Sequence, residues 1–347
     1  MNKKEIAEIR KQMSLLRHSI VRICDCYVNA DKEIQMMSQK AFLSLPEETM
    51  GEYLDIFKKS VSGNLGKNLL TLSYQTKTEL PEQAFLLDLR DSQLSDMSKN
   101  EAFFKKVIDS YDYDCGYYIV LAYGMYDIPG KHGDDSADVY EYLICTICPM
   151  QLTKSALSYA SESNSIEDRT RDLVIELPMH AFLYPAFTDR AANVHEALLY
   201  TKKTGKLPKR WIQDVLGTKV PLSFDDQKKA FYDILPETTS LSDFLAIQDE
   251  INMLQDDEAV EVVDTDTAKE ILKTVGLTSD VPLPESIPIT TLSGNKKISM
   301  DGIQITVDSD VSLDIKEVDG CKYLMIPVNT NVDVNGVVVR PCSDQPL

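Results

Sequence analysis

The strongest apolar pattern lies in the middle of the chain, in two segments at 117–128 and 139–150. Both segments are rich in aromatic and β-branched residues, which is typical of strands. The residues between them, PGKHGDD, have the composition of a turn. Together they predict a long antiparallel hairpin.

Other segments follow one of two periodicities. Alternating or β-rich runs predict strands at 19–28 and 68–74, and short strands at 172–177 and 181–187. Apolar residues three and four apart predict helices at 47–61, 81–96, 99–109, 207–216, 223–235, 240–255 and 268–275. The segment 193–203 fits both periods, so a helix and a strand stay open there.

The C-terminal end has a different pattern. A linker that contains prolines, at 282–288, precedes short apolar runs, and turns containing SGN, MDG, VDG and VNG separate several of them. These runs predict strands at 289–292, 297–300, 303–307, 311–315, 323–328 and 334–339. A β-rich unit of this size needs packing against other structure to be stable.

These elements predict an α+β protein. We expect a mixed or antiparallel sheet with the long central hairpin, covered by helices, then a helical middle and the small β-rich C-terminal unit. The corresponding domains are an α+β N-terminal domain at 1–205, a helical region at 206–280 and the C-terminal unit at 281–347.

Net charge limits the choice of partners. The 347 residues include 36 basic and 55 acidic ones, a net charge of −19, and 241–347 alone holds 7 basic against 20 acidic residues. Such a charge repels polyanions at long range and disfavours a protein that coats nucleic acid by charge alone. It permits a local basic patch, because charges in solution are screened over about 8 Å.

The sequence also indicates a compartment. The first residues, MNKKEIAEIRKQ, lack the apolar core of a secretory signal. The longest uncharged apolar stretch, Tyr117–Tyr126, is shorter than the ~20 residues of a membrane helix. Seven irregularly spaced cysteines are expected to be thiols in a reducing compartment. We therefore expect a cytoplasmic protein that makes no use of a membrane.

Four cysteines form a candidate metal or redox set, namely Cys24, Cys26, Cys145 and Cys148. Four sulfurs are the number that a structural zinc ion takes. Zinc-binding cysteines usually lie in turns, however, and these four lie in β-branched apolar runs without glycine. On a strand, Cys24 and Cys26 share a face about 6.6 Å apart. Buried free cysteines are the favoured interpretation, and a zinc site or redox chemistry is the alternative.

One segment is basic within the acidic chain. Residues 197–213 hold no acid and five basic residues, namely Lys202, Lys203, Lys206, Lys209 and Arg210. The only tryptophan, Trp211, follows them directly. Basic side chains contact phosphates and an aromatic ring can stack on a base, so these six residues are the candidate nucleic-acid site. A solvated connection with Trp211 in the core is the favoured interpretation, and the nucleic-acid site is the alternative to it.

Three classes of function stay open. No G-x-S-x-G, kinase or Rossmann motif is present. A non-enzymatic cytoplasmic binding or scaffold protein is therefore preferred, with no cofactor. The alternatives are a metal- or thiol-dependent enzyme that uses the four cysteines, and an acidic module that binds a basic protein or a second copy of itself.

Several long stretches carry a resemblance to known proteins. They include RICDCYV, IFKKSVSGNLGKNLL, YEYLICTICP and FLYPAFTDRAANVHEALLYTKK. On these stretches, the chain resembles a family of uncharacterised proteins of clostridial and related Gram-positive bacteria. That family implies no activity and no site residue.

A more distant resemblance is one of element order. A helical region followed by a hairpin, EAFFKKVIDSYDYDCGYYIVLAYGMYDI and VYEYLICTICPM, and a late acidic helix before a small β unit are similar to the bacterial nucleoid-associated protein family. This resemblance implies a cytoplasmic protein that associates with DNA. The CDC and CTICP thiols and the PGKHGDD loop depart from that family's pattern.

Overall fold

The chain divides into two compact units, 1–227 and 228–347, and the division falls within helix α6 (Phe224–Asp233). The computed structural model describes residues 1–74, 80–128, 138–168, 171–257, 260–326, 328, 330–334 and 337–339. The helices expected at 206–280 are therefore shared between the two units. The α+β class predicted from the sequence is confirmed.

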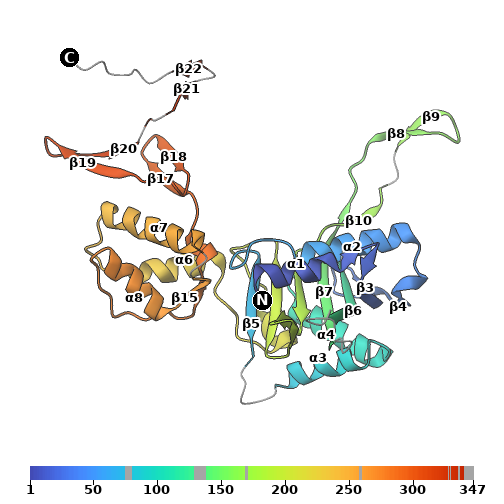
Figure 1. Ribbon diagram of the computed structural model, residues 1–347. Helices are drawn as coiled ribbons and strands as arrows, with labels where there is room; N and C mark the ends of the chain where they lie inside the picture. Colours follow the sequence, from blue (N-terminus) through green and yellow to red (C-terminus); the bar gives the residue numbers. More distant parts are fainter. Residues whose placement is uncertain are drawn as a thin grey trace. The chain divides into compact units, whose positions relative to one another are not determined.

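An eight-stranded antiparallel sheet organises the first unit (Figure 1). In spatial order its main strands are β4 (Ile34–Ala41), β3 (Ile20–Val28), β6 (Tyr117–Ile128), β7 (Asp138–Leu152), β11 (His180–Tyr184), β14 (Glu196–Thr201) and β5 (Leu69–Ser73), and β10 (Leu173–Ile175) pairs with β7. The predicted hairpin is confirmed, since β6 pairs with β7 from Tyr117 opposite Pro149 to Ile128 opposite Asp138. The predicted turn falls in 129–137, outside the described residues.

Helices cover both faces of this sheet (Figure 1). One face packs against α1 (Lys3–Lys11) and α2 (Glu47–Ser60). The other face packs against α3 (Pro81–Asp91), α4 (Met97–Ser110) and the helical turns α5 (Lys209–Trp211) and η2 (Ile212–Leu216). Strand β6 is buried on both sides because its alternate residues enter the two cores. This explains its unbroken apolar sequence.

Several element boundaries differ from the prediction. The segment 193–203, which was open, forms strand β14. Helix α3 ends at Asp91 rather than at 96, because Gln93 and Leu94 adopt left-handed backbone angles with φ of 52° and 54°. Helix α1 was not predicted, although Asn2 and Glu5 form a capping box at its start.

Short antiparallel pairs of strands lie outside the main sheet of the first unit. They are β1 (Met13–Ser14) with β2 (Arg17–His18), β12 (Ala186–Thr188) with β13 (Ala191–Asn193), and β8 (Leu157–Ala160) with β9 (Ser165–Asp168); a 3-10 turn, η1, covers Phe42–Ser44. The β8–β9 hairpin, which was not predicted, projects away from the sheet beyond β7 and β10 (Figure 1). We call residues 157–168 the arm.

The second unit combines a small helical core with hairpins. The core contains α7 (Leu241–Asp256), α8 (Thr265–Thr274), the paired strands β15 (Val262–Val263) and β16 (Ile287–Pro288), and α9 (Ile289–Leu292). The strand predicted at 289–292 is wrong, since this segment makes the helical turn α9. It caps the core with Ile289 and Leu292, which are buried.

Three hairpins follow along the chain. They are β17 (Lys296–Met300) with β18 (Ile303–Val307), β19 (Asp314–Val318) with β20 (Cys321–Met325), and β21 (Val332–Val334) with β22 (Val337–Val339). The strands predicted at 311–315 and 323–328 lie instead at 314–318 and 321–325, because the turn at Asp319 and Gly320 sets their register. The single strand predicted at 334–339 is instead divided between β21 and β22.

Candidate functional site

Three of the four candidate cysteines lie on one face of the sheet. Cys24 and Cys26 on β3 and Cys145 on β7 belong to the core beneath α3 and α4. Cys24 pairs with Leu121 of β6, and Leu121 pairs with Cys145, so a whole strand separates the two cysteines. Two strand spacings place their backbones roughly 10 Å apart. Thiolates that share a zinc ion each lie about 2.3 Å from it.

Cys148 lies on the opposite face, in the core beneath α1 and α2. Burial raises the pKa of Cys24, Cys26 and Cys148 to about 12 and raises the pKa of Cys145 well above its usual value. The four thiols are therefore not brought together, and all are protonated at neutral pH. Across the described ranges, no three His, Cys, Asp or Glu side chains are grouped to hold a metal ion.

This burial predicts selective labelling. Iodoacetamide added to the native protein at neutral pH should alkylate Cys115 and Cys321, which are exposed, before any of the four buried cysteines. Peptide mass spectrometry checks the order of labelling, and denatured protein labelled at every cysteine is the control. Rapid native labelling of Cys145 would contradict the burial described here.

The five basic residues lie at 202–210, which we call the basic segment. It comprises the connection that follows β14 and the first two residues of α5. All five of their side chains are exposed. The connection leaves the sheet at Thr201, whose hydroxyl donates a hydrogen bond to the carbonyl of Lys203 at 2.9 Å. The backbone N–H of Lys202 donates to the carbonyl of Met179 at 2.8 Å. Both bonds fix the start of the basic segment on the sheet.

Arg210 differs from the four lysines. Its guanidinium lies 3.7 Å from a carboxylate oxygen of Asp112 and donates a hydrogen bond of 3.1 Å to the carbonyl of Asp109. Within the part of the chain that the structure describes, no carboxylate lies within 4.0 Å of the ammonium groups of Lys202, Lys203, Lys206 or Lys209. Their charges therefore face solvent.

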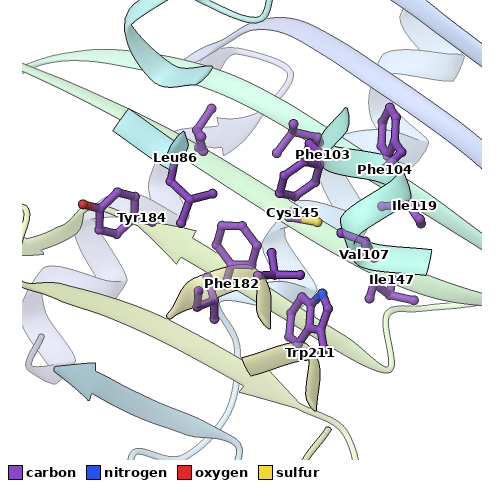
Figure 2. Close-up of a cluster of buried hydrophobic side chains, with 14 of the residues drawn as sticks. Leu86, Phe103, Phe104, Val107, Ile119, Cys145, Ile147, Phe182, Tyr184 and Trp211 are labelled. Carbon is purple, nitrogen blue, oxygen red and sulfur yellow. The ribbon is translucent and has the colours of Figure 1, made fainter. Parts of the chain in front are cut away.

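Trp211 lies in the core rather than beside these cations, as Figure 2 shows. Its side chain is 0% exposed, and its ring centre lies 5.8 Å from that of Phe182 and 6.3 Å from that of Tyr111. A fully buried indole cannot stack on a base, so the candidate stacking role of Trp211 is wrong and the core position favoured from the sequence is the one observed. The ring instead anchors the end of the basic segment against the sheet.

A groove of about 620 Å³ lies along the second half of the basic segment. Lys206, Lys209 and Gln213 supply polar groups to it, and Leu207 and Val220 join it to the core behind. Asp226 also lines the groove, and its carboxylate accepts a 2.7 Å hydrogen bond from the hydroxyl of Ser223. The groove thus combines two exposed lysines with one acid that has a local partner.

Comparison with protein families gives one match. A family model described as a domain of unknown function, DUF4317, matches residues 1–337. The chain belongs to this family. Both units of the DUF4317 chain lie within the matched range, apart from its last ten residues. No curated protein matches it. No helix among the described residues of this DUF4317 protein has the length and apolar character needed to cross a bilayer.

A buried carboxylate that was not predicted from the sequence lies in the DUF4317 sheet. Asp25 on β3 is 1% exposed and lies on the face covered by α2. It accepts hydrogen bonds from the hydroxyls of Ser38 at 2.5 Å, Tyr118 at 2.8 Å and Tyr53 at 3.0 Å, and the ammonium of Lys40 lies 3.7 Å away. In the sequence, this site was indicated only by an aspartate that stands between two cysteines in an apolar strand. The network links β3, β4, β6 and α2.

A second overlooked group surrounds His180, at the start of β11. Its Nδ1 shares a hydrogen bond of 2.7 Å with the hydroxyl of Tyr111, and its ring centre lies 6.4 Å from that of Trp211. Burial lowers the pKa of His180 to about 4, so the imidazole is neutral at physiological pH. Packing among Tyr111, His180 and Trp211, together with the Tyr111–His180 hydrogen bond, holds α4 and the basic segment against the sheet.

This histidine predicts a loss of stability in mild acid. Below its ordinary pKa of 6.5, His180 takes up a proton in the unfolded chain but not in the folded one, until the pH reaches about 4. The free energy of unfolding should therefore fall by about 2 kcal/mol between pH 7 and pH 5. Urea unfolding followed by Trp211 emission measures this. The change should be lost in His180→Gln, and an equal change in that variant would contradict the assignment.

Proposed function

We propose that this DUF4317 protein is a non-enzymatic cytoplasmic protein that binds double-stranded DNA through the basic segment. The observation that carries the proposal is the presence of four exposed lysines without carboxylate partners among the described residues, within the nine residues 202–210. Lysines placed in this way can replace the counterions of successive phosphates. Arg210 and the groove lined by Lys206 and Lys209 extend the same positive surface.

The distribution of charge supports this choice of surface. Residues 1–227 contain 27 basic and 33 acidic residues, whereas 228–347 contain 9 and 22. The basic segment therefore belongs to the less acidic unit, which carries −6 of the total −19. The contact would be with the phosphate backbone and without base specificity, because Trp211 is buried and the lysines act as point charges.

The alternative of a thiol or metal enzyme has less support. The candidate thiols are separated by a strand or by the sheet itself, and burial keeps them protonated. The buried network of Asp25 has its hydrogen bonds satisfied by its own side chains. Neither group offers an accessible nucleophile or base.

A matched pair of variants tests the proposal. In the first, Lys202, Lys203, Lys206 and Lys209 are changed to Gln. In the control, the exposed residues Lys3, Lys4, Lys11 and Lys58 are changed to Gln. Both variants have the same net charge of −23, four less than the −19 of the wild type. Any difference between them therefore reports where the charges lie.

The measurement is fluorescence anisotropy of a labelled DNA duplex at low salt. We expect the first variant to raise the dissociation constant at least tenfold, and the control to change it by less than about twofold. Circular dichroism shows whether both variants are folded. Equal affinity of the two variants, or no binding by the wild type, would contradict the proposal.

A further inference from the structure

Two basic residues stand opposite each other where the arm leaves the sheet (Figure 1). Just beyond the paired strands β7 and β10, the backbone N–H of Thr153 donates a hydrogen bond of 2.9 Å to the carbonyl of Asp172. The backbone N–H of Asp172 in turn donates to the hydroxyl oxygen of Thr153 at 3.1 Å. These two bonds continue the β7–β10 register by one residue. Lys154 and Arg171 are the next residues on the two segments and therefore face each other.

A groove of about 490 Å³ lies at this point, and we call it the root groove. Its lining residues are Leu152, Thr153, Lys154, Ser155 and Arg171. Lys154 and Arg171 are exposed, and across the described part of the chain no carboxylate lies within 4.0 Å of either charged group. Like charges that face each other across two strands are destabilising. An anion held between the two side chains would remove this repulsion.

The other residues of the root groove add neutral contacts. The hydroxyl oxygen of Thr153 already accepts a hydrogen bond from Asp172, so the hydroxyl proton remains to be donated to a ligand. Ser155 brings a second hydroxyl. Leu152 is 52% exposed and supplies an apolar wall beside the two cations. The root groove thus combines two positive charges, two hydroxyl groups and one apolar surface.

We propose that the root groove binds a small phosphate monoester, with the phosphate between Lys154 and Arg171 and the organic part against Leu152. A phosphate monoester carries about −1.5 to −2 charges at pH 7 and has three strong acceptor oxygens, so two cations balance its charge. The guanidinium of Arg171 can donate to two phosphate oxygens at once, and Lys154 supplies a point charge. A carboxylate has a single negative charge and would leave one cation unbalanced. The volume of the groove lies within the range of about 300–1,000 Å³ that is usual for small-molecule sites.

The charge of the arm favours a small anion over nucleic acid. Residues 157–168 contain three acids, Glu162, Glu167 and Asp168, and no basic residue. A duplex that crossed the root would bring many phosphates close to these carboxylates, whereas a single phosphate group needs only the two cations. Phosphate binding at the root therefore does not depend on DNA binding by the basic segment.

The test compares two probes and two variants of the full chain. Phenyl phosphate is the probe, and benzoate, which has the same ring with a carboxylate, is its control. Saturation-transfer NMR of the ring protons measures the dissociation constants of both. The test variant combines Lys154→Gln with Arg171→Gln, and the control variant combines Lys11→Gln with Arg17→Gln at two other exposed cations. Both variants have a net charge of −21, two less than the −19 of the wild type. Circular dichroism shows that each is folded.

We expect the wild type to bind phenyl phosphate with a dissociation constant of about 1 mM, and benzoate at least tenfold more weakly. The test variant should bind phenyl phosphate at least tenfold more weakly than the wild type, and the control variant within about twofold of it. Both variants should keep the wild-type affinity for a DNA duplex within about twofold.

Three results would overturn the phosphate site. The first is a wild-type dissociation constant for phenyl phosphate above about 10 mM, which would leave DNA binding by the basic segment standing. The second is equal binding of phenyl phosphate and benzoate, or of phenyl phosphate by the two variants. The third is a tenfold loss of duplex affinity in the test variant, which would assign Lys154 and Arg171 to the DNA surface.

Discussion

Trp211→Ala should lower the free energy of unfolding of the first unit by about 3–5 kcal/mol. The indole is fully buried and packs against Phe182, Tyr111 and His180, so its removal leaves a large cavity between η2 and the sheet. Differential scanning calorimetry follows the transition of this unit, whose midpoint should fall by roughly 10 °C. Leu16→Ala, at an apolar side chain that is 97% exposed, is the control and should lower the free energy of unfolding by less than about 0.5 kcal/mol.

A second change at Trp211 distinguishes a role in packing from a role in DNA contact. Trp211→Phe keeps most of the buried volume and should leave DNA affinity within about twofold of the wild type, because the indole does not reach solvent. A folded Trp211→Phe variant with a tenfold weaker affinity for the duplex would contradict this account and restore the stacking role expected from the sequence.

Asp25→Ala should lower the free energy of unfolding by about 3–5 kcal/mol, which is as much as Trp211→Ala. The change removes a carboxylate that is 1% exposed and is the shared acceptor for the hydroxyls of Ser38, Tyr53 and Tyr118. Urea unfolding followed by Trp211 emission reports on the unit that contains Asp25. The midpoint should shift, with little change in the slope of the transition.

A surface carboxylate is the matched control for Asp25. Asp112 also lies beside two cations, Lys32 and Arg210, but its side chain is 70% exposed. Asp112→Ala should therefore cost no more than about 1 kcal/mol. Similar losses for Asp25→Ala and Asp112→Ala would show that the buried network does not contribute as described.

The sequence predicted those elements that are buried on both sides. Strands β6 and β7 were recognisable because both of their faces enter a core, which leaves an unbroken apolar run. Strand β4 was missed because it lies at the edge of the sheet, and its residues Ile34–Ala41 are mostly exposed. The arm was missed for the same reason, since its apolar side chains are few and unburied.

The candidate sites depended on relations between distant segments, which local pattern does not contain. Cys24 and Cys145 lie on the same face of the sheet, yet strand β6 runs between them. Trp211 follows five basic residues, yet its ring turns towards Phe182 of β11. Asp25 finds its partners on β4, β6 and α2. The exposure of the basic segment, by contrast, was predictable from its composition.

The salt dependence of DNA binding shows whether the four lysines of the basic segment contact phosphates. Each phosphate neutralised contributes about −0.9 to the slope of log K against log salt concentration. We expect a slope of about −4 for the wild type, and a slope close to zero when Lys202, Lys203, Lys206 and Lys209 are changed to Gln. Equal slopes for the two proteins would place the DNA contacts elsewhere and contradict the account.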